Sequence, residues 1–163
     1  MLSSGARRFR GATRAGEQWF EIRVKRYVSR ASEKLDAFML NEDRKGLSDI
    51  ENAWAIADLM KEHGWTTQVQ VAAGIGRNTR TGQVWVSSTL ALLRCTPAVQ
   101  AKMHPSIKQD DRLTKQVAVF FSKLNDAIQD DLITRMPPHL KTATAQLAWV
   151  KKESDALGAV LPT

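Results

Sequence analysis

The sequence has one cysteine, no excess of acid and no long apolar run, and each of these features excludes a class of protein. Because Cys95 has no partner for an internal disulfide, a reducing cytosol is favoured. No stretch approaches the ~18 apolar residues of a membrane span, and the start of the chain lacks the apolar core of a secretory signal. We therefore expect a cytoplasmic protein without a membrane partner.

Chemical motifs are also scarce. The three histidines lack metal-ligand spacing, so no metal site is expected. No Walker-type or Gly-x-Gly-x-x-Gly segment is present. Cys95 follows an apolar helical pattern, which is typical of a small core residue rather than a nucleophile. These absences leave binding, rather than catalysis, as the function to look for.

Positive charge is what the chain has in excess. The net charge is +7 over 163 residues, and apolar residues make up 43%, which is enough for a core. Residues 1–30 hold eight Arg and Lys against two acids, and residues 65–97 hold three arginines and no acid. This distribution suits a polyanionic partner. The alternative is a basic surface that is only solvated.

The residue pattern predicts a mainly α fold: a helix-turn-helix within a multi-helix bundle, after a short basic αβ segment. Residues 19–25 alternate apolar and charged, which is typical of a half-buried strand. Ser48 and Glu51 have the spacing of a capping box, for a helix that ends before Gly64. Further helices are expected as follows: from Ser29 or Ser32 to Leu40, from Thr66 or Thr67 to Ala73, from Val84 to Leu93, from Pro97 to Met103, from Asp110 or Asp111 to Leu124, and over 126–136 and 139–152.

The polar turn at residues 77–82 stands between two helices and has the chemistry of a DNA reader. Arginine suits guanine O6 and N7, and Asn or Gln suits adenine, while threonine hydroxyls and a helix N-terminus suit phosphates. The other face of the second helix is expected to pack on Trp54, Val69 and Ala72. The candidate DNA-binding residues are Thr67, Gln68, Arg77, Asn78, Thr79, Arg80, Thr81, Gln83 and Ser87. The alternative is a plain helical hairpin with arginines in a solvated loop.

Three segments in order resemble the ParB-type partition proteins. Gly5-Ala6-Arg7-Arg8 is similar to the family's Gly-Glu-Arg-Arg box, and the segment from Asn41 to Ser48 is similar to its second box. The helix-turn-helix and the exit Leu92-Leu93-Arg94-Cys95-Thr96-Pro97 follow in family order. The resemblance covers roughly residues 3–100.

The resemblance implies a protein that binds a centromere-like palindrome in double-stranded DNA. It also implies a homodimer, a ParA-type ATPase as partner, and a location on a plasmid or the nucleoid. In the family the two boxes bind CTP with Mg²⁺, and the matching residues here are Gly5, Arg7, Arg8, Asn41 and Arg44. Ala6 and Leu40 stand where the family has acids, so CTP hydrolysis is not expected of this chain.

Four regions are expected along the chain: a partial nucleotide-box segment at 1–28, a DNA-binding domain at 29–105, a helical extension at 106–152 and a flexible tail at 153–163. Two other functions stay open. One is a helix-turn-helix repressor of a mobile element, and the other is a helical interaction module without DNA binding.

Overall fold

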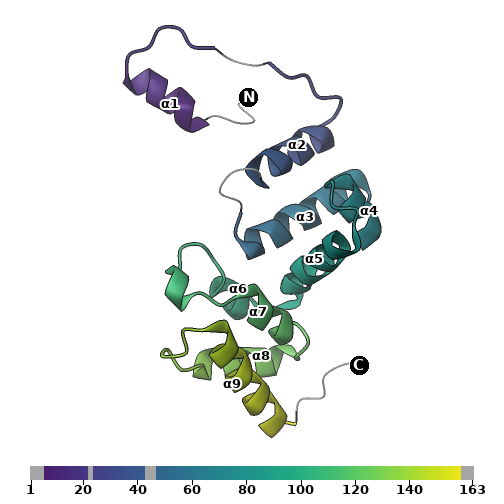
Figure 1. Cartoon of the computed structure of the whole chain (residues 1–163), viewed down its shortest axis with the longest axis vertical. Helices are drawn as coiled ribbons and strands as arrows, with labels where there is room; N and C mark the ends of the chain where they lie inside the picture. The colour runs from purple at the N-terminus through teal and green to yellow at the C-terminus, as the bar shows by residue number, and fades with distance from the viewer. Residues whose placement is uncertain (1–5, 22–23, 43–46, 159–163) are drawn as a thin grey trace. The chain divides into compact units, whose positions relative to one another are not determined.

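The structure, a computed structural model, describes residues 6–21, 24–42 and 47–158, which form helices joined by turns and irregular segments (Figure 1). The expected mainly α class is therefore confirmed. The chain divides into two compact units, Met1–Gly46 and Leu47–Thr163. The helix after Ser29 thus groups with the N-terminal segment, and only residues 47–105 of the expected DNA-binding domain share a unit with the expected helical extension.

The first unit contains α1 (Ala6–Arg14) and α2 (Arg30–Glu42). Ser29 caps the start of α2, because its hydroxyl accepts from the backbone N–H of Ser32 at 3.2 Å. Asp36 anchors the preceding segment to α2 by accepting from Lys25 and, at 2.5 Å, from the Tyr27 hydroxyl. The hydrogen bond from Lys25 is the main reason why the pKa of Asp36 is lowered.

The expected strand at 19–25 is wrong for the residues that the structure describes. Residues 19–21 and 24–25 are irregular, and no described segment lies beside them as a strand. Trp19 is 89% exposed and Val24 is 78% exposed. Alternation predicts a strand only where a neighbour takes up the backbone hydrogen bonds and covers one face. The basic αβ segment is therefore reduced to a basic helix and an irregular connection.

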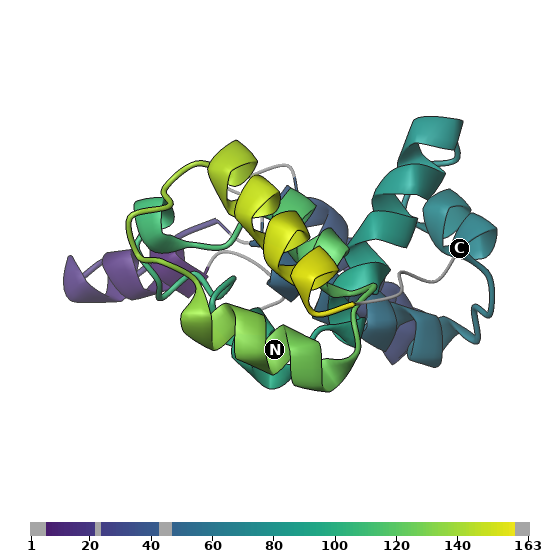
Figure 2. The ribbon, with the colours of Figure 1, turned by 90° about the horizontal axis from the view of Figure 1, so that it is seen from below.

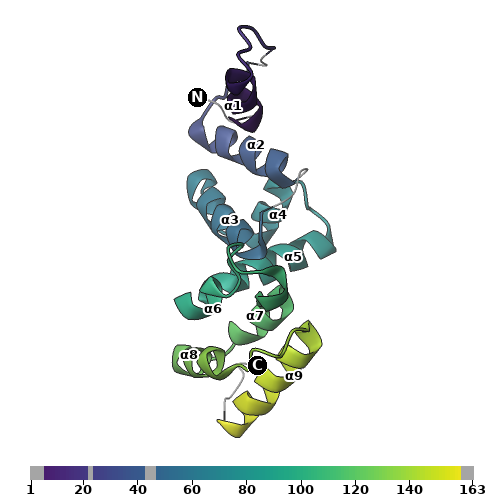
Figure 3. The ribbon, with the colours of Figure 1, turned by 90° about the vertical axis from the view of Figure 1, so that its left-hand side faces the viewer.

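The second unit is a bundle of short helices, which Figure 3 shows from a second side. Its α-helices are α3 (Asp49–His63), α4 (Gln68–Gly74), α5 (Arg80–Ala91), α6 (Pro97–Ala101), α7 (Lys115–Phe121), α8 (Asp126–Arg135) and α9 (Ala143–Ala156), with 3₁₀ turns η1 (Leu92–Arg94) and η2 (Gln109–Asp111). No helix among the described residues is long and apolar enough to cross a membrane.

The predicted caps of α3 are confirmed at both ends. The Ser48 hydroxyl accepts from the Glu51 backbone, and the Glu51 carboxylate accepts from the Ser48 backbone N–H at 2.8 Å. Gly64 ends the helix in the left-handed region at φ 66°, which costs glycine little. Both signals are local, so the sequence alone specifies them.

Three of the expected helices have the wrong boundaries. Helix α5 begins at Arg80 rather than Val84, because Thr79 caps it by accepting from Gly82 N–H at 3.1 Å. Helix α7 begins at Lys115, and the aspartates before it lie in a 3₁₀ turn. Helix α9 runs over Ala143–Ala156 rather than 139–152, so part of the expected tail is helical. Residues 159–163 of that tail lie outside the described residues.

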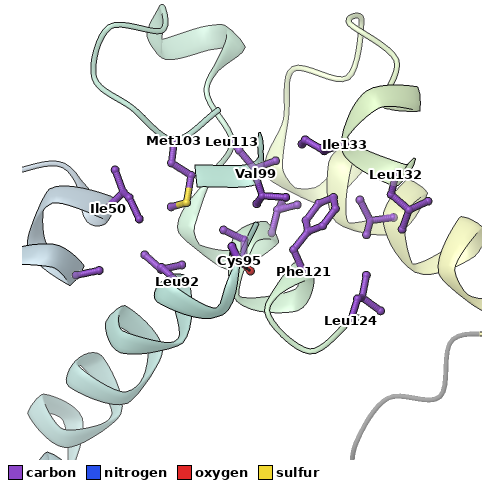
Figure 4. Packing of buried hydrophobic residues seen from close by; sticks show 14 residues of the cluster. Ile50, Leu92, Cys95, Val99, Met103, Leu113, Phe121, Leu124, Leu132 and Ile133 are labelled. Carbon is purple, nitrogen blue, oxygen red and sulfur yellow. Dashed lines mark hydrogen bonds between the residues drawn. The ribbon is translucent and has the colours of Figure 1, made fainter. Parts of the chain in front are cut away.

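The main core of the second unit surrounds Phe121 of α7, which is fully buried (Figure 4). It receives side chains from α3, from η1 and from every later α-helix. Its members are Ile50, Ala53, Leu92, Cys95, Val99, Met103, Leu113, Val117, Ala118, Phe121, Leu124, Leu132, Ile133 and Val150. Helices α8 and α9 contact each other, and α9 also contacts α7 (Figure 2). Burial of this size dominates the stability of the unit.

Candidate nucleic-acid interface

Helices α4 and α5 are joined by a tight turn over residues 75–79. Gly76 adopts φ 73°, a left-handed conformation that favours glycine. Ile75 inserts into the protein interior, and Val86 of α5 is fully buried as well. Helix α5 packs against both α3 and α4. The tight turn and the burial of Ile75 and Val86 together fix the orientation of the first residues of α5.

Gly82 allows the turn to approach α5 more closely than any other residue would. A Cβ atom at this position would lie 2.0 Å from the carbonyl oxygen of Arg77, which is far inside van der Waals contact. The Arg77 N–H in turn donates to the carbonyl of Ala72 in α4 at 2.6 Å. Gly82 is therefore a packing residue in the first turn of α5, and not part of a polar turn as the sequence suggested.

Most candidate DNA-binding residues lie together at this end of α5. Asn78, Arg80 and Thr81 are exposed there, and Gln83 and Ser87 are partly exposed farther along the helix. Thr79 lies among them, but its hydroxyl is occupied in the α5 cap. The first turn of a helix carries a partial positive charge, which adds to that of Arg80.

Thr67 and Gln68 lie at the start of α4. The Thr67 hydroxyl accepts from Gln70 N–H at 3.2 Å, and the Gln70 side chain accepts from the Thr67 backbone at 3.0 Å, so the two form a capping box. Gln68 is exposed. Residues 65–97 contain no acid, so no carboxylate of this segment opposes an anion at either helix start.

Arg77 is held differently from the other candidates. Its guanidinium lies over the ring of Trp85, 4.2 Å from the centroid, and the residue is partly buried. The Lys115 ammonium of α7 lies 4.9 Å from the centroid of the same ring. It donates to Thr89 Oγ1 at 2.6 Å, and burial lowers its pKa. Arg77 therefore supports Trp85 in the described conformation, whereas Arg80 extends from the surface.

Sequence reasoning missed the exposed valines of this region. Val69 and Trp54 were expected to pack against α5. Val69 is instead 58% exposed on α4, and Trp54 is 44% exposed. Val84 is 61% exposed and stands one helical turn after Arg80. The i, i+4 spacing from Arg80 would have placed Val84 on this face once the start of α5 was known. An apolar side chain there suits the methyl group of thymine.

The residues that match the family's nucleotide boxes belong to the first unit. Arg8 is exposed on α1, and Asn41 is exposed at the end of α2. Gly5, Arg44 and the side chain of Arg7 lie outside the described residues. The described residues include no group of three His, Cys, Asp or Glu side chains placed to hold a metal ion.

Cys95 occupies the core, as the sequence predicted. It is buried beside Ala118, whose carbonyl accepts from its thiol at 3.2 Å. Burial raises its pKa to about 12. The thiolate needed for nucleophilic chemistry is therefore disfavoured.

No protein-family model, curated protein or solved structure matches this chain.

Proposed function

We propose that the second unit binds duplex DNA in a sequence-specific manner, with the first turn of α5 in the major groove. The observation that carries the proposal is the group Asn78, Arg80 and Thr81, exposed together at the N-terminus of a helix that α3 and α4 hold in place. These side chains match the donors and acceptors of base edges and phosphates. The segment that carries them contains no acid.

The geometry also supports different roles for the residues proposed to contact DNA. Arg80 stands at the first position of α5, so it is the residue best placed to read guanine. The start of α4, with Thr67 and Gln68, supplies backbone N–H groups and polar side chains for phosphates. Val84 adds an apolar contact one turn into α5.

The biological role that we propose is ParB-type partition of a plasmid or chromosome, through a centromere-like palindrome. It rests on the order of the two boxes and the helix pair along the chain. A second copy of the chain and a ParA-type ATPase are the proposed partners. CTP with Mg²⁺ is the cofactor of the resembled family, and binding here would involve Arg8 and Asn41 of the first unit.

The decisive test is selection of bound sequences from a random duplex pool at ~150 mM salt, where binding to phosphates alone is weakened. We expect one inverted repeat to be enriched, because a two-fold dimer reads two half-sites. Recovery of duplexes without an enriched motif would replace sequence reading by backbone binding. Recovery of no duplex would favour the interaction module.

Arg80→Ala then tests the placement of α5. We expect a loss of about 1–3 kcal/mol in binding free energy on the selected site, with relaxed preference at one base pair. Lys152→Ala removes an exposed positive charge from α9 and is the control. Arg77→Ala is a poorer test, because it also removes the stacking on Trp85. Equal losses for Arg80→Ala and Lys152→Ala would show non-specific charge attraction.

Repression of a mobile element remains the second candidate function, since it uses the same DNA site. Binding of a ParA-type ATPase separates the two: partition requires such a partner and repression does not. A pull-down with a ParA-type ATPase, where one is encoded beside this chain, with and without DNA, makes the distinction.

A further inference from the structure

The second unit contains a cavity of about 540 Å³, away from the α4–α5 pair. It lies between residues 102–113 and residues 133–146. Most of its lining residues are apolar, and they include Leu113, Ile133 and two prolines. Three lysines, Lys102, Lys108 and Lys141, also line it, together with Ser106, Asp111 and Gln146. Cavities of this size are typical of small-molecule sites in proteins.

Positive charge dominates the rim of the cavity. Among the lining residues whose side chains the structure describes, three are lysines and one is an acid, Asp111, which accepts a hydrogen bond from Lys141. Lys102 and Lys108 are exposed and also attract the Asp111 carboxylate, and the three lysines together leave a net positive charge at the rim. An anionic group is therefore the ligand feature that this rim favours.

The inner wall of the cavity is apolar and belongs to the main core. Leu113 and Ile133 are both buried members of the cluster around Phe121. Pro137 and Pro138 line the cavity between α8 and α9, and each fixes its own backbone φ. A rigid apolar wall beside a cationic rim suits a ligand that carries both an apolar body and an anionic group.

The polar groups of the walls are held by hydrogen bonds. Arg112 donates to the carbonyls of Pro105 and Ile107 at 3.0 and 2.9 Å, which fixes the loop that bears Ser106. Gln146 is 4% exposed and donates to the Leu140 carbonyl at 2.9 Å. Its Oε1 atom is buried and has no hydrogen-bond partner among the described residues. A buried acceptor without a partner costs free energy.

We propose that this cavity binds a small organic anion, a carboxylate- or phosphate-bearing molecule with an apolar body. The anionic group lies toward Lys102 and Lys108, and the apolar body lies against Leu113 and Ile133. This site is separate from the proposed DNA surface, so the two proposals stand or fall independently.

The first test is fluorescence titration of the full chain with anilinonaphthalene sulfonate, which combines an aromatic body with one negative charge. We expect saturable binding of one dye per chain. The uncharged analogue N-phenyl-1-naphthylamine should bind at least about tenfold more weakly, because it lacks the group that the lysines attract. Equal binding of the two dyes, or binding of many dyes per chain, would overturn the proposal.

Competition identifies the head group. Displacement by phenyl phosphate assigns a phosphate ligand, and displacement by hexanoate assigns a carboxylate ligand. Inorganic phosphate at the same concentration should not displace the dye, since it has no apolar body. Displacement by inorganic phosphate to the same extent would reduce the cavity to an ion site and contradict the proposal.

The double variant K102Q/K108Q locates the site. We expect the affinity for the sulfonate dye to fall about tenfold, as the loss of two exposed charge contacts allows. The control K123Q/K152Q removes the same charge from exposed positions outside the cavity, and we expect a change of less than about twofold. The far-ultraviolet circular dichroism of both variants should match the parent chain. Equal losses in the two double variants would overturn the assignment.

Discussion

The two halves of the second unit bury their side chains in different ways. Helices α6–α9 surround Phe121 with a large cluster, whereas α4 and α5 bury only a few residues, among them Val71, Ala72 and Val86. Helices α6–α9 therefore supply most of the apolar burial, whereas α4 and α5 hold polar and apolar side chains at the surface. The helices that supply most of the stability therefore differ from the helices that are proposed to bind DNA.

Helix α3 connects the two halves. Its N-terminal residues Ile50 and Ala53 belong to the cluster around Phe121, while Ile56 and Leu59 are buried farther along the helix. Lys115 makes a second connection, because its ammonium on α7 donates to Thr89 of α5. The halves should therefore unfold together, even though their cores differ in size.

The largest effect is expected for Phe121→Ala. The substitution opens a cavity in the main core, so the free energy of unfolding should fall by about 3–5 kcal/mol. Urea denaturation measures the loss. Phe120→Ala is the control, because the neighbouring ring is only partly buried and should cost less. If both variants lost the same stability, the main core would not be centred on Phe121.

Gln129→Leu tests the polar contacts within the same half. Gln129 is 1% exposed; its Oε1 accepts from Thr96 N–H at 2.8 Å, and its Nε2 donates to the Leu124 carbonyl at 2.9 Å. Leucine leaves both backbone groups buried without this partner, at a cost of about 2–3 kcal/mol. Thermal unfolding measures the loss. Gln100→Leu removes similar hydrogen bonds at a half-exposed site, so its thermal midpoint should fall less than that of Gln129→Leu. Equal shifts would contradict this role of burial.

Gly82→Ala acts on the half that carries the proposed DNA surface. The added Cβ collides with the Arg77 carbonyl, so the turn must move, and we expect a loss of about 1–3 kcal/mol in unfolding free energy. Gly11→Ala in α1 is the control, since a Cβ there meets no atom within 4 Å. It should raise helicity instead, because alanine favours helices. A stabilising Gly82→Ala would exclude the close approach between the turn and α5.

Local signals in the sequence were enough for the ends of α3. The capping box of Ser48 and Glu51 and the terminal Gly64 need only residues close in sequence. The cap of α5 also had a local signal, Thr79, but the β-prone Val84-Trp85-Val86 run drew the expected start of the helix four residues too late. The sequence does not show why residue 82 is a glycine. The reason is its close contact with Arg77, and not a backbone conformation that favours glycine.

Other features depend on contacts between distant residues. Trp85 lies between Arg77 and Lys115, and only the fold brings Lys115 to α5. The cavity likewise joins residues that precede and follow α7 in the chain, and no spacing within the sequence predicts it. The expected strand at 19–25 failed for the same reason, because alternation says nothing of whether a neighbour exists.

The smallest effect is expected for Glu51→Gln, at the start of the helix shared by both halves. Hydrogen bonds from the Ser48 side chain and backbone lower the pKa of Glu51 below its usual 4.5, and His104 and Arg112 add weaker attraction. The carboxylate therefore contributes its stability in full above about pH 4.5 and loses it as the pH falls through the lowered pKa. Glutamine keeps an acceptor for the Ser48 N–H, so at pH 7 the loss should be below about 1 kcal/mol.

The measurement is urea denaturation of the parent chain and Glu51→Gln between pH 7 and pH 3. The stability difference between them should shrink as the pH falls, because the parent chain loses a contribution that the variant never had. Asp155→Asn removes an exposed acid at the end of α9 and is the control. A difference that stayed constant across the range would mean that the charge of Glu51 adds nothing to the cap. The start of α3 would then depend on the Ser48 hydroxyl and on the burial of Ile50 in the main core.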